Sequence, residues 1–158
     1  MTNPLQIAFF LLLALAVPVA VWKGGTPERF GAAAILFMWG LQSVGDRILP
    51  SGWTSVDTFS FLSDVTGFLA FGYLALEARR IWPLWATSLQ ILSLSAHFAR
   101  WADITIHPMV YAVMRGAPTF GALIAILLGV LFHLRRLRRD GSDPAWQIWC
   151  RFAAGSNR

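Results

Sequence analysis

The sequence is poor in charged residues and almost devoid of lysine and cysteine. Charged residues make up 13% of the 158 positions and hydrophobic residues make up 56%. An ordinary soluble domain is roughly one quarter charged. Because a small soluble domain has little interior in which to bury apolar side chains, this composition predicts a single-domain integral membrane protein.

These scarcities also exclude several kinds of site. The single cysteine, Cys150, cannot form an internal disulfide or a cysteine-based metal cluster. The only lysine, Lys23, lies in an expected loop, so no lysine inside the membrane can carry a retinal Schiff base. His97 and His133 are expected near opposite membrane faces and cannot share a haem iron. No nucleotide-binding glycine loop or Ser-His-Asp order is present, so the sequence identifies neither an enzyme nor a cofactor.

Five apolar runs approach the length that crosses a bilayer, about 20 residues at about 1.5 Å each. Turn and capping residues separate the runs, for example Thr26-Pro27-Glu28 before the second. We therefore predict an all-α bundle of five transmembrane helices within a domain of residues 1–139. The expected spans cover residues 4–22, 29–45, 56–76, 82–102 and 118–134. Residues 103–117 are expected to lie at the membrane surface with a short helical stretch.

The positive charges predict the orientation of this bundle. Five spans place ten basic residues on one side of the membrane and three on the other. Because cytoplasmic loops carry the excess of arginine and lysine, the N-terminus is expected outside and the C-terminus inside a bacterial-type cytoplasmic (inner) membrane. The ten are Lys23, Arg29, Arg79, Arg80, Arg135, Arg136, Arg138, Arg139, Arg151 and Arg158; the three are Arg47, Arg100 and Arg115. The arginine cluster at the end of a span points to the lipid bilayer and anionic lipid, and not to nucleic acid.

Residues 140–158 are predicted to form a cytoplasmic amphipathic tail. Pro144 is suited to the first position of a short helix. Trp146, Trp149 and Phe152 follow at near-helical spacing beside Arg151. Such a helix would lie on the cytoplasmic leaflet as an anchor or serve as a docking surface.

Small residues recur every four positions in the fifth expected span, at Ala117, Gly121, Ala125 and Gly129. Such a stripe lets another helix backbone approach closely. The partner helix belongs either to this chain or to a second membrane protein or copy of the chain. We favour packing within the chain.

Polar side chains gather at one depth below the expected outer face. Asp64 in the third span and His97 in the fourth each lie roughly 7–9 Å from that face, at about 1.5 Å per residue. Gln42 of the second span lies at a similar level. An ionisable residue at such a depth is costly unless it is paired or faces water. Asp64 and His97 are the expected pair, with Arg100 as a competing partner for the carboxylate.

Two interpretations of this layer remain open. In the first, Asp64, His97, Gln42, Arg100 and Asp57 line an outward-facing pocket that binds a proton, a metal ion or a small polar ligand. In the second, Asp57 caps a helix and Asp64 and His97 form a buried hydrogen bond that fixes the helix register.

A metal site could also draw on His97, Asp103 and His107 near the expected outer face. Their spacing does not match a standard single-helix pattern such as His-Glu-x-x-His. A metal therefore remains a hypothesis that the spacing itself does not favour.

The favoured function is that of a non-catalytic binding, scaffolding or accessory subunit of a membrane assembly. The small-residue stripe, the tryptophan-bearing tail and the lack of a catalytic motif motivate it. The alternative is a small carrier, sensor or enzyme that uses the pocket around Asp64 and His97.

Overall fold

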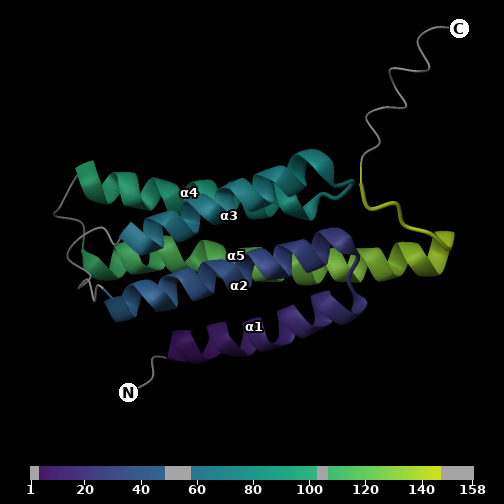
Figure 1. The fold of residues 1–158 in the computed structure, drawn as a ribbon, viewed down its shortest axis with the longest axis horizontal. Helices are drawn as coiled ribbons and strands as arrows, with labels where there is room; N and C mark the ends of the chain where they lie inside the picture. Colours follow the sequence, from purple (N-terminus) through teal and green to yellow (C-terminus); the bar gives the residue numbers. More distant parts are fainter. Residues whose placement is uncertain (1–3, 49–57, 103–106, 147–158) are drawn as a thin grey trace, which may run out of the picture.

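The computed structural model describes residues 4–48, 58–102 and 107–146, and these residues form a bundle of long helices (Figure 1). Apart from an isolated bridge between Ala78 and Trp146, the regular structure of these residues is entirely α-helical. The helices are α1 (Pro4–Lys23), α2 (Thr26–Ile48), α3 (Thr58–Glu77), α4 (Trp82–Ala102) and α5 (Pro108–Asp140). The prediction of an all-α bundle is confirmed.

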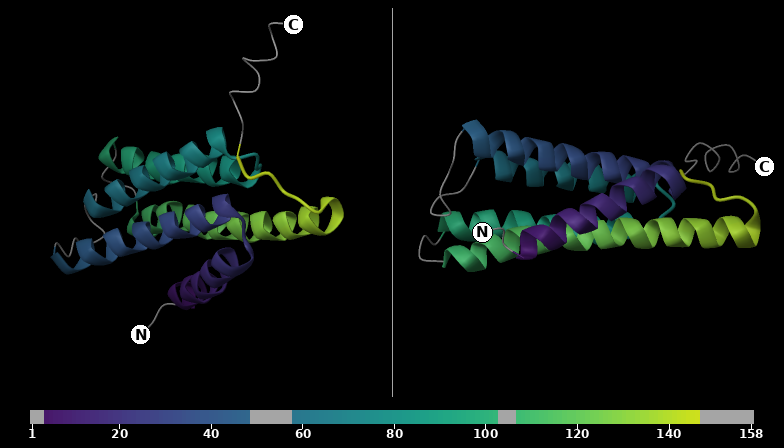
Figure 2. Two further views of the ribbon diagram at one scale, coloured as in Figure 1. Left: turned by 45° about the vertical axis from the view of Figure 1, so that its right-hand side comes forward. Right: turned by 90° about the horizontal axis from the view of Figure 1, so that it is seen from below.

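The helices run side by side, and α1 lies on the outside of the others (Figure 2). α2 packs on α3, α3 on α4 and α4 on α5, while α1 covers the seam between α2 and α5. The short connections from α1 to α2 and from α3 to α4 lie at the same end of the bundle, where α5 projects beyond its neighbours (Figure 1). We call this end the arginine end, because it carries Arg79, Arg80, Arg135, Arg136, Arg138 and Arg139.

Three helices are long and apolar enough to cross a membrane: α1, α3 and the Met109–Asp140 part of α5. α2 and α4 do not meet that standard, although each is more than 20 residues long. The physical reason is visible in α4, where Gln90, Ser93, His97 and Arg100 all point into the bundle and are buried. Polar side chains on an inward face lower the hydropathy of a helix without exposing charge to lipid.

The helix that was expected to start at Pro118, after a surface segment at 103–117, begins earlier in the structure, at Pro108. One continuous helix runs from Pro108 to Asp140, with Pro118 inside it. The helix begins at Pro108 because proline suits the first turn and the His107 side chain accepts a hydrogen bond from the Met109 N–H at 3.2 Å. It ends at Asp140 and is capped by Gly141, whose φ of 70° allows its N–H to bond the Leu137 carbonyl. Its 33 residues extend about 50 Å, so it is longer than a bilayer core of about 30 Å.

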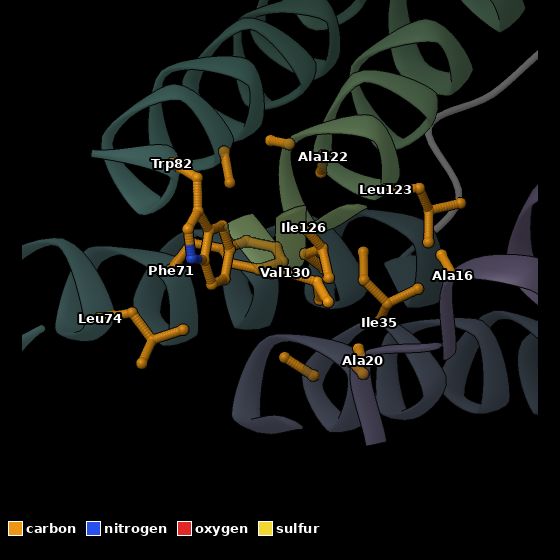
Figure 3. Packing of buried hydrophobic residues seen from close by; sticks show 14 of the residues in the cluster. Ala16, Ala20, Ile35, Phe71, Leu74, Trp82, Ala122, Leu123, Ile126 and Val130 are labelled. Atoms are coloured by element: carbon orange, nitrogen blue, oxygen red, sulfur yellow. The ribbon is translucent and has the colours of Figure 1, made fainter. Parts of the chain in front are cut away.

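Trp82 fills the centre of the bundle near the arginine end (Figure 3). Its ring meets Phe71 of α3 edge-on, with ring centres 6.2 Å apart. Two glycines make room for the ring on two of its sides, because a Cβ at either position would overlap it. A Cβ on Gly31 would lie 2.6 Å from Trp82 Cη2, and one on Gly129 would lie 2.6 Å from Trp82 Nε1. The indole N–H donates to Glu28 Oε1 at 2.9 Å. One side chain thereby joins α2, α3, α4 and α5.

The small-residue stripe on α5 faces α4 of the same chain. Gly121 lies against Leu89, Ala125 is buried, and Gly129 lies against Trp82. Ala117, the first member, is exposed and takes no part in this contact.

Residues 141–146 form an extended segment, which we call the strap. It folds back from α5 onto the α3–α4 connection, where the Arg79 N–H donates to the Ala145 carbonyl at 3.1 Å. Trp146 packs against the hydrophobic core, with its ring 6.5 Å from that of Tyr73. The expected tail helix therefore does not begin at Pro144, because Asp143 is held by ion pairs and does not cap a helix. Trp149, Arg151 and Phe152 lie outside the described residues.

Replacing Gly129 with alanine should lower the free energy of unfolding by about 1–3 kcal/mol, the usual effect of overpacking, because the new methyl group overlaps a buried ring that cannot turn aside. Gly121→Ala should cost less than about 1 kcal/mol, because its methyl group meets only the flexible end of Leu89 at 2.7 Å. Thermal unfolding in mild detergent measures both.

Gly40→Ala is the matched control, since nothing lies within 4 Å of a Cβ at that position. It should leave the unfolding temperature unchanged or raise it slightly, because alanine favours helix. Equal losses of thermal stability in all three variants would contradict the assignment of Gly129 to a tight contact.

Candidate functional site

Four buried side chains from three helices form a continuous hydrogen-bonded chain near the end of the bundle opposite the arginine end. Asp64 of α3 accepts hydrogen bonds at Oδ2 from Ser93 Oγ (2.7 Å) and His97 Nε2 (2.9 Å) of α4. His97 Nδ1 lies 2.8 Å from the hydroxyl of Tyr111 on α5. Each of the four residues is at most 2% exposed. We call Asp64, Ser93, His97 and Tyr111 the His97 cluster.

Helical periodicity brings these groups together. Ser93 and His97 are four residues apart on α4 and share the face that packs on α3. Asp64 lies on the buried face of α3 with Ser60 and Gly67. Tyr111 reaches His97 because α5 begins as early as Pro108. The predicted pairing of Asp64 with His97 is therefore present in the structure.

The neutral imidazole of His97 fits both of its hydrogen-bond partners. In neutral His97, the Nε2–H donates to the carboxylate and Nδ1 accepts from the Tyr111 hydroxyl. In an imidazolium, Nδ1–H would instead donate to the Tyr111 oxygen, and the Tyr111 hydroxyl would need another acceptor for its own proton.

Aromatic rings and Arg100 surround this chain. Phe61 meets the imidazole of His97 edge-on, with centres 5.6 Å apart. The Arg100 guanidinium lies 5.7 Å from the centre of the Tyr111 ring, in a cation–π arrangement. Among the described residues no ion pair joins Arg100 to Asp64, so the competition expected for the carboxylate is not seen.

Of the other predicted site residues that the structure describes, Gln42 and His107 do not join the cluster. Gln42 is half-buried, and within the described part of the chain no hydrogen bond links it to Asp64 or His97. Asp57 and Asp103 lie outside the described residues. His107 is exposed and caps α5.

A metal at His97 would have to displace its present partners. Both ring nitrogens of His97 already have hydrogen-bond partners, Asp64 and Tyr111. Over residues 4–48, 58–102 and 107–146, no group of three or more histidine, cysteine, aspartate or glutamate side chains could hold a metal ion.

Two further residues belong to this region. The sequence places Tyr111 in the connection before the fifth span, on the same outer side as His97, but gives no signal for their contact. The three-or-four spacing of Gln90, Ser93, His97 and Arg100 predicts one polar face of α4, and all four side chains are buried. The amide nitrogen and oxygen of Gln90 have no hydrogen-bond partner in the described structure.

A second buried polar cluster closes the arginine end, and sequence reasoning did not identify it. The guanidinium of Arg80 lies between two carboxylates: its Nε is 3.3 Å from Glu28 Oε1 and its Nη1 is 2.7 Å from Asp143 Oδ1. His133 Nδ1 and Arg136 Nε also approach Asp143, at 2.6 Å and 3.0 Å. We call Glu28, Arg80, His133, Arg136 and Asp143 the Arg80 cluster. Its members come from α2, the α3–α4 connection, α5 and the strap, so the linear sequence gives no spacing that reveals it.

The surroundings of Asp143 shift its ionisation. Burial raises the pKa of this carboxyl, but hydrogen bonds from His133, Arg80 and Arg136 and the charge of Arg80 lower it by more. The net result is a pKa below the usual range of aspartate. The carboxylate is thus held in its charged form.

Tyr111→Phe should lower the free energy of unfolding by about 0.5–1.5 kcal/mol, the usual value of one hydrogen bond, because it removes the partner of a fully buried imidazole nitrogen. Tyr73→Phe is the matched control, since Tyr73 is 53% exposed. Thermal unfolding in detergent should separate the two variants. Equal unfolding temperatures would mean that the Tyr111–His97 bond contributes nothing to stability.

Acid should remove the stabilisation that Asp143 provides. Because its pKa is lower in the folded chain than in the unfolded one, its ion pairs contribute fully above about pH 4 and lose their effect as the pH falls through the lowered value. The unfolding temperatures of wild type and Asp143→Asn should therefore differ at pH 6 and converge towards pH 3. A difference that stays constant over this range would contradict the shift.

Comparisons of the chain with protein-family models, with curated proteins and with solved structures each give no match. The function proposed next accordingly rests on the geometry of the chain's own residues.

Proposed function

We propose that this chain is a small multi-pass protein of the cytoplasmic membrane that acts as a non-catalytic binding or accessory subunit of a membrane assembly. The observation that carries the proposal is the burial and mutual bonding of the His97 cluster. Asp64, Ser93, His97 and Tyr111 bond to one another and are nearly inaccessible. A buried hydrogen-bonded network of this kind fixes the register of packed helices.

The contacts made by the small-residue stripe on α5 also bear on this proposal. Gly121 and Gly129 are occupied by Leu89 and Trp82 of the same chain. A partner would therefore contact other faces, which carry large apolar side chains such as Leu11, Leu69 and Trp85, each more than 60% exposed. Such side chains suit contact with lipid or with the helices of another membrane protein.

The positions of the charges support five spans with the N-terminus outside. The helix ends at the arginine end carry Lys23, Arg29 and the six arginines named above, whereas Arg47 and Arg100 lie towards the opposite end. Proteins of the cytoplasmic membrane retain their basic ends in the cytoplasm. In our proposal the arginine end is cytoplasmic and the His97 cluster lies near the outer face.

A second candidate function is proton binding by the His97 cluster, as part of a sensor or carrier. The observation that favours it is the uninterrupted chain of hydrogen bonds from Ser93 through Asp64 and His97 to Tyr111. Gln90 lies beyond Ser93 on the same face, fully buried and with no hydrogen-bond partner in the described structure. Intramembrane chains of ionisable side chains of this kind are typical of proton relays.

Purification of the full chain from its native membranes in mild detergent tests the accessory role. We expect a complex with a second protein in fixed proportion, well above the 17.5 kDa of one chain. A monomer without any partner protein would contradict the proposal.

The variants Asp64→Asn and His97→Ala separate the two functions. If the chain is an accessory subunit, each variant that still folds should keep its partner and the activity of the assembly. Loss of that activity with the partner still bound would favour the proton-binding function instead. Thermal unfolding identifies a variant that fails only because it no longer folds.

A further inference from the structure

The Arg80 cluster is arranged around one carboxylate that comes from outside the bundle. Asp143 belongs to the strap, and its side chain is 3% exposed. Three cationic or protonatable groups meet it: Arg80 Nη1 at 2.7 Å, Arg136 Nε at 3.0 Å and His133 Nδ1 at 2.6 Å. These three groups form the kind of site that binds an anion. Here the bound anion is the Asp143 carboxylate of the same chain.

The bundle positions these three groups without help from the strap. His133 and Arg136 are one helical turn apart on α5, so their side chains emerge on the same side. Arg80 is fixed by Glu28, which Trp82 holds through its indole N–H. Removing Asp143 would therefore leave a preformed group of donors with a positive charge that Glu28 only partly neutralises.

The strap is a short segment outside the helices. Besides the ion pairs of Asp143, its contacts in the described structure include the bond from the Arg79 N–H to the Ala145 carbonyl, the bridge between Ala78 and Trp146, and the half-buried ring of Trp146 beside Tyr73. Gly141, Ser142 and Pro144 are exposed. The helices pack on one another through contacts in which the strap takes no part.

The depth of the site indicates which anion would reach it. The apolar sequence of α5 ends at Leu134, and Arg135 and Arg136 follow directly. In a helix that crosses a membrane, this transition lies at the level of the lipid phosphates. Arginine suits a phosphate because its guanidinium presents two parallel N–H donors.

We propose that Arg80, His133 and Arg136 form a phosphate-binding site for the headgroup of an anionic phospholipid, and that Asp143 is an internal occupant that competes with this ligand. Inorganic phosphate offers the same chemistry without the lipid, so the two sources are tested separately. The site lies at the opposite end of the bundle from the His97 cluster and does not depend on its function.

Binding to the purified full chain in detergent tests the proposal, with phosphatidylglycerol, phosphatidylcholine and inorganic phosphate as probes. Asp143→Ala should bind phosphatidylglycerol about tenfold more tightly than wild type, because an internal competitor reduces the apparent affinity by the fraction of vacant sites. Native mass spectrometry measures the lipid retained. Phosphatidylcholine, which has no net charge, should show a much smaller gain.

Asp140→Ala is the matched control. It removes the same charge three residues away, but Asp140 is exposed and pairs only with the exposed Arg139 in the described structure. An equal gain in Asp140→Ala, or no gain in Asp143→Ala, would overturn the proposal. If Asp143→Ala unfolds, Asp143→Asn keeps the size of the side chain and should show the same gain.

Arg136→Gln provides a second check, because its side chain is 38% exposed and contributes less to folding than Arg80. Combined with Asp143→Ala, it should cancel the gain in lipid binding. A gain that survives this change would contradict the assigned site. Competition by millimolar inorganic phosphate would show that the phosphate group alone is recognised, whereas no competition would assign recognition to the whole lipid headgroup.

Discussion

The arrangement of the helices depends on the requirement that a polar group removed from water find a partner. Leaving a buried donor or acceptor unpaired costs about 1–3 kcal/mol, and more when it is charged, which is comparable with much of a protein's net stability. The bundle meets much of this requirement through bonds that cross from helix to helix, with the buried amide of Gln90 as an exception in the described structure. Asp64 needs His97 of the next helix, and His97 needs Tyr111 of the one after. Apolar side chains tolerate sliding and rotation of neighbouring helices, whereas these bonds specify one register.

The same requirement operates at the arginine end with full charges. Glu28 is fully buried, and its contacts with Trp82 and Arg80 join α2 to the α3–α4 connection. Arg80 in turn holds Asp143, so the strap is linked to α2 through a single guanidinium. The two clusters lie at opposite ends of the bundle, and the apolar packing of Trp82, Phe71 and Ile126 adjoins the Arg80 cluster (Figure 3). Each end is thereby tied across several helices.

Sequence patterns predicted those features whose cause is local. The apolar runs predicted five helices. An ionisable side chain inside a membrane is costly unless it has a partner, and this cost predicted the pairing of Asp64 with His97. The early start of α5 was missed because Pro118 resembled a helix start, and with it the contact of Tyr111 was missed. The Arg80 cluster was missed because Glu28 and Arg80 each resemble ordinary charged residues at a helix end. Only the tertiary fold brings them together with Asp143, and no spacing in the sequence indicates that these residues are neighbours.

The position of α1 has a consequence for how the chain assembles. In the described structure α1 contributes no side chain to the His97 cluster or to the Arg80 cluster, and it buries only Leu13, Ala16 and Ala20. The bonds that specify register all lie among α2 to α5 and the strap. Along the chain, however, α1 precedes all of these helices and is synthesised before them. A helix made earlier than α2 to α5 thus takes no part in the bonds that specify their register, and it can remain at the periphery while the later helices find one another.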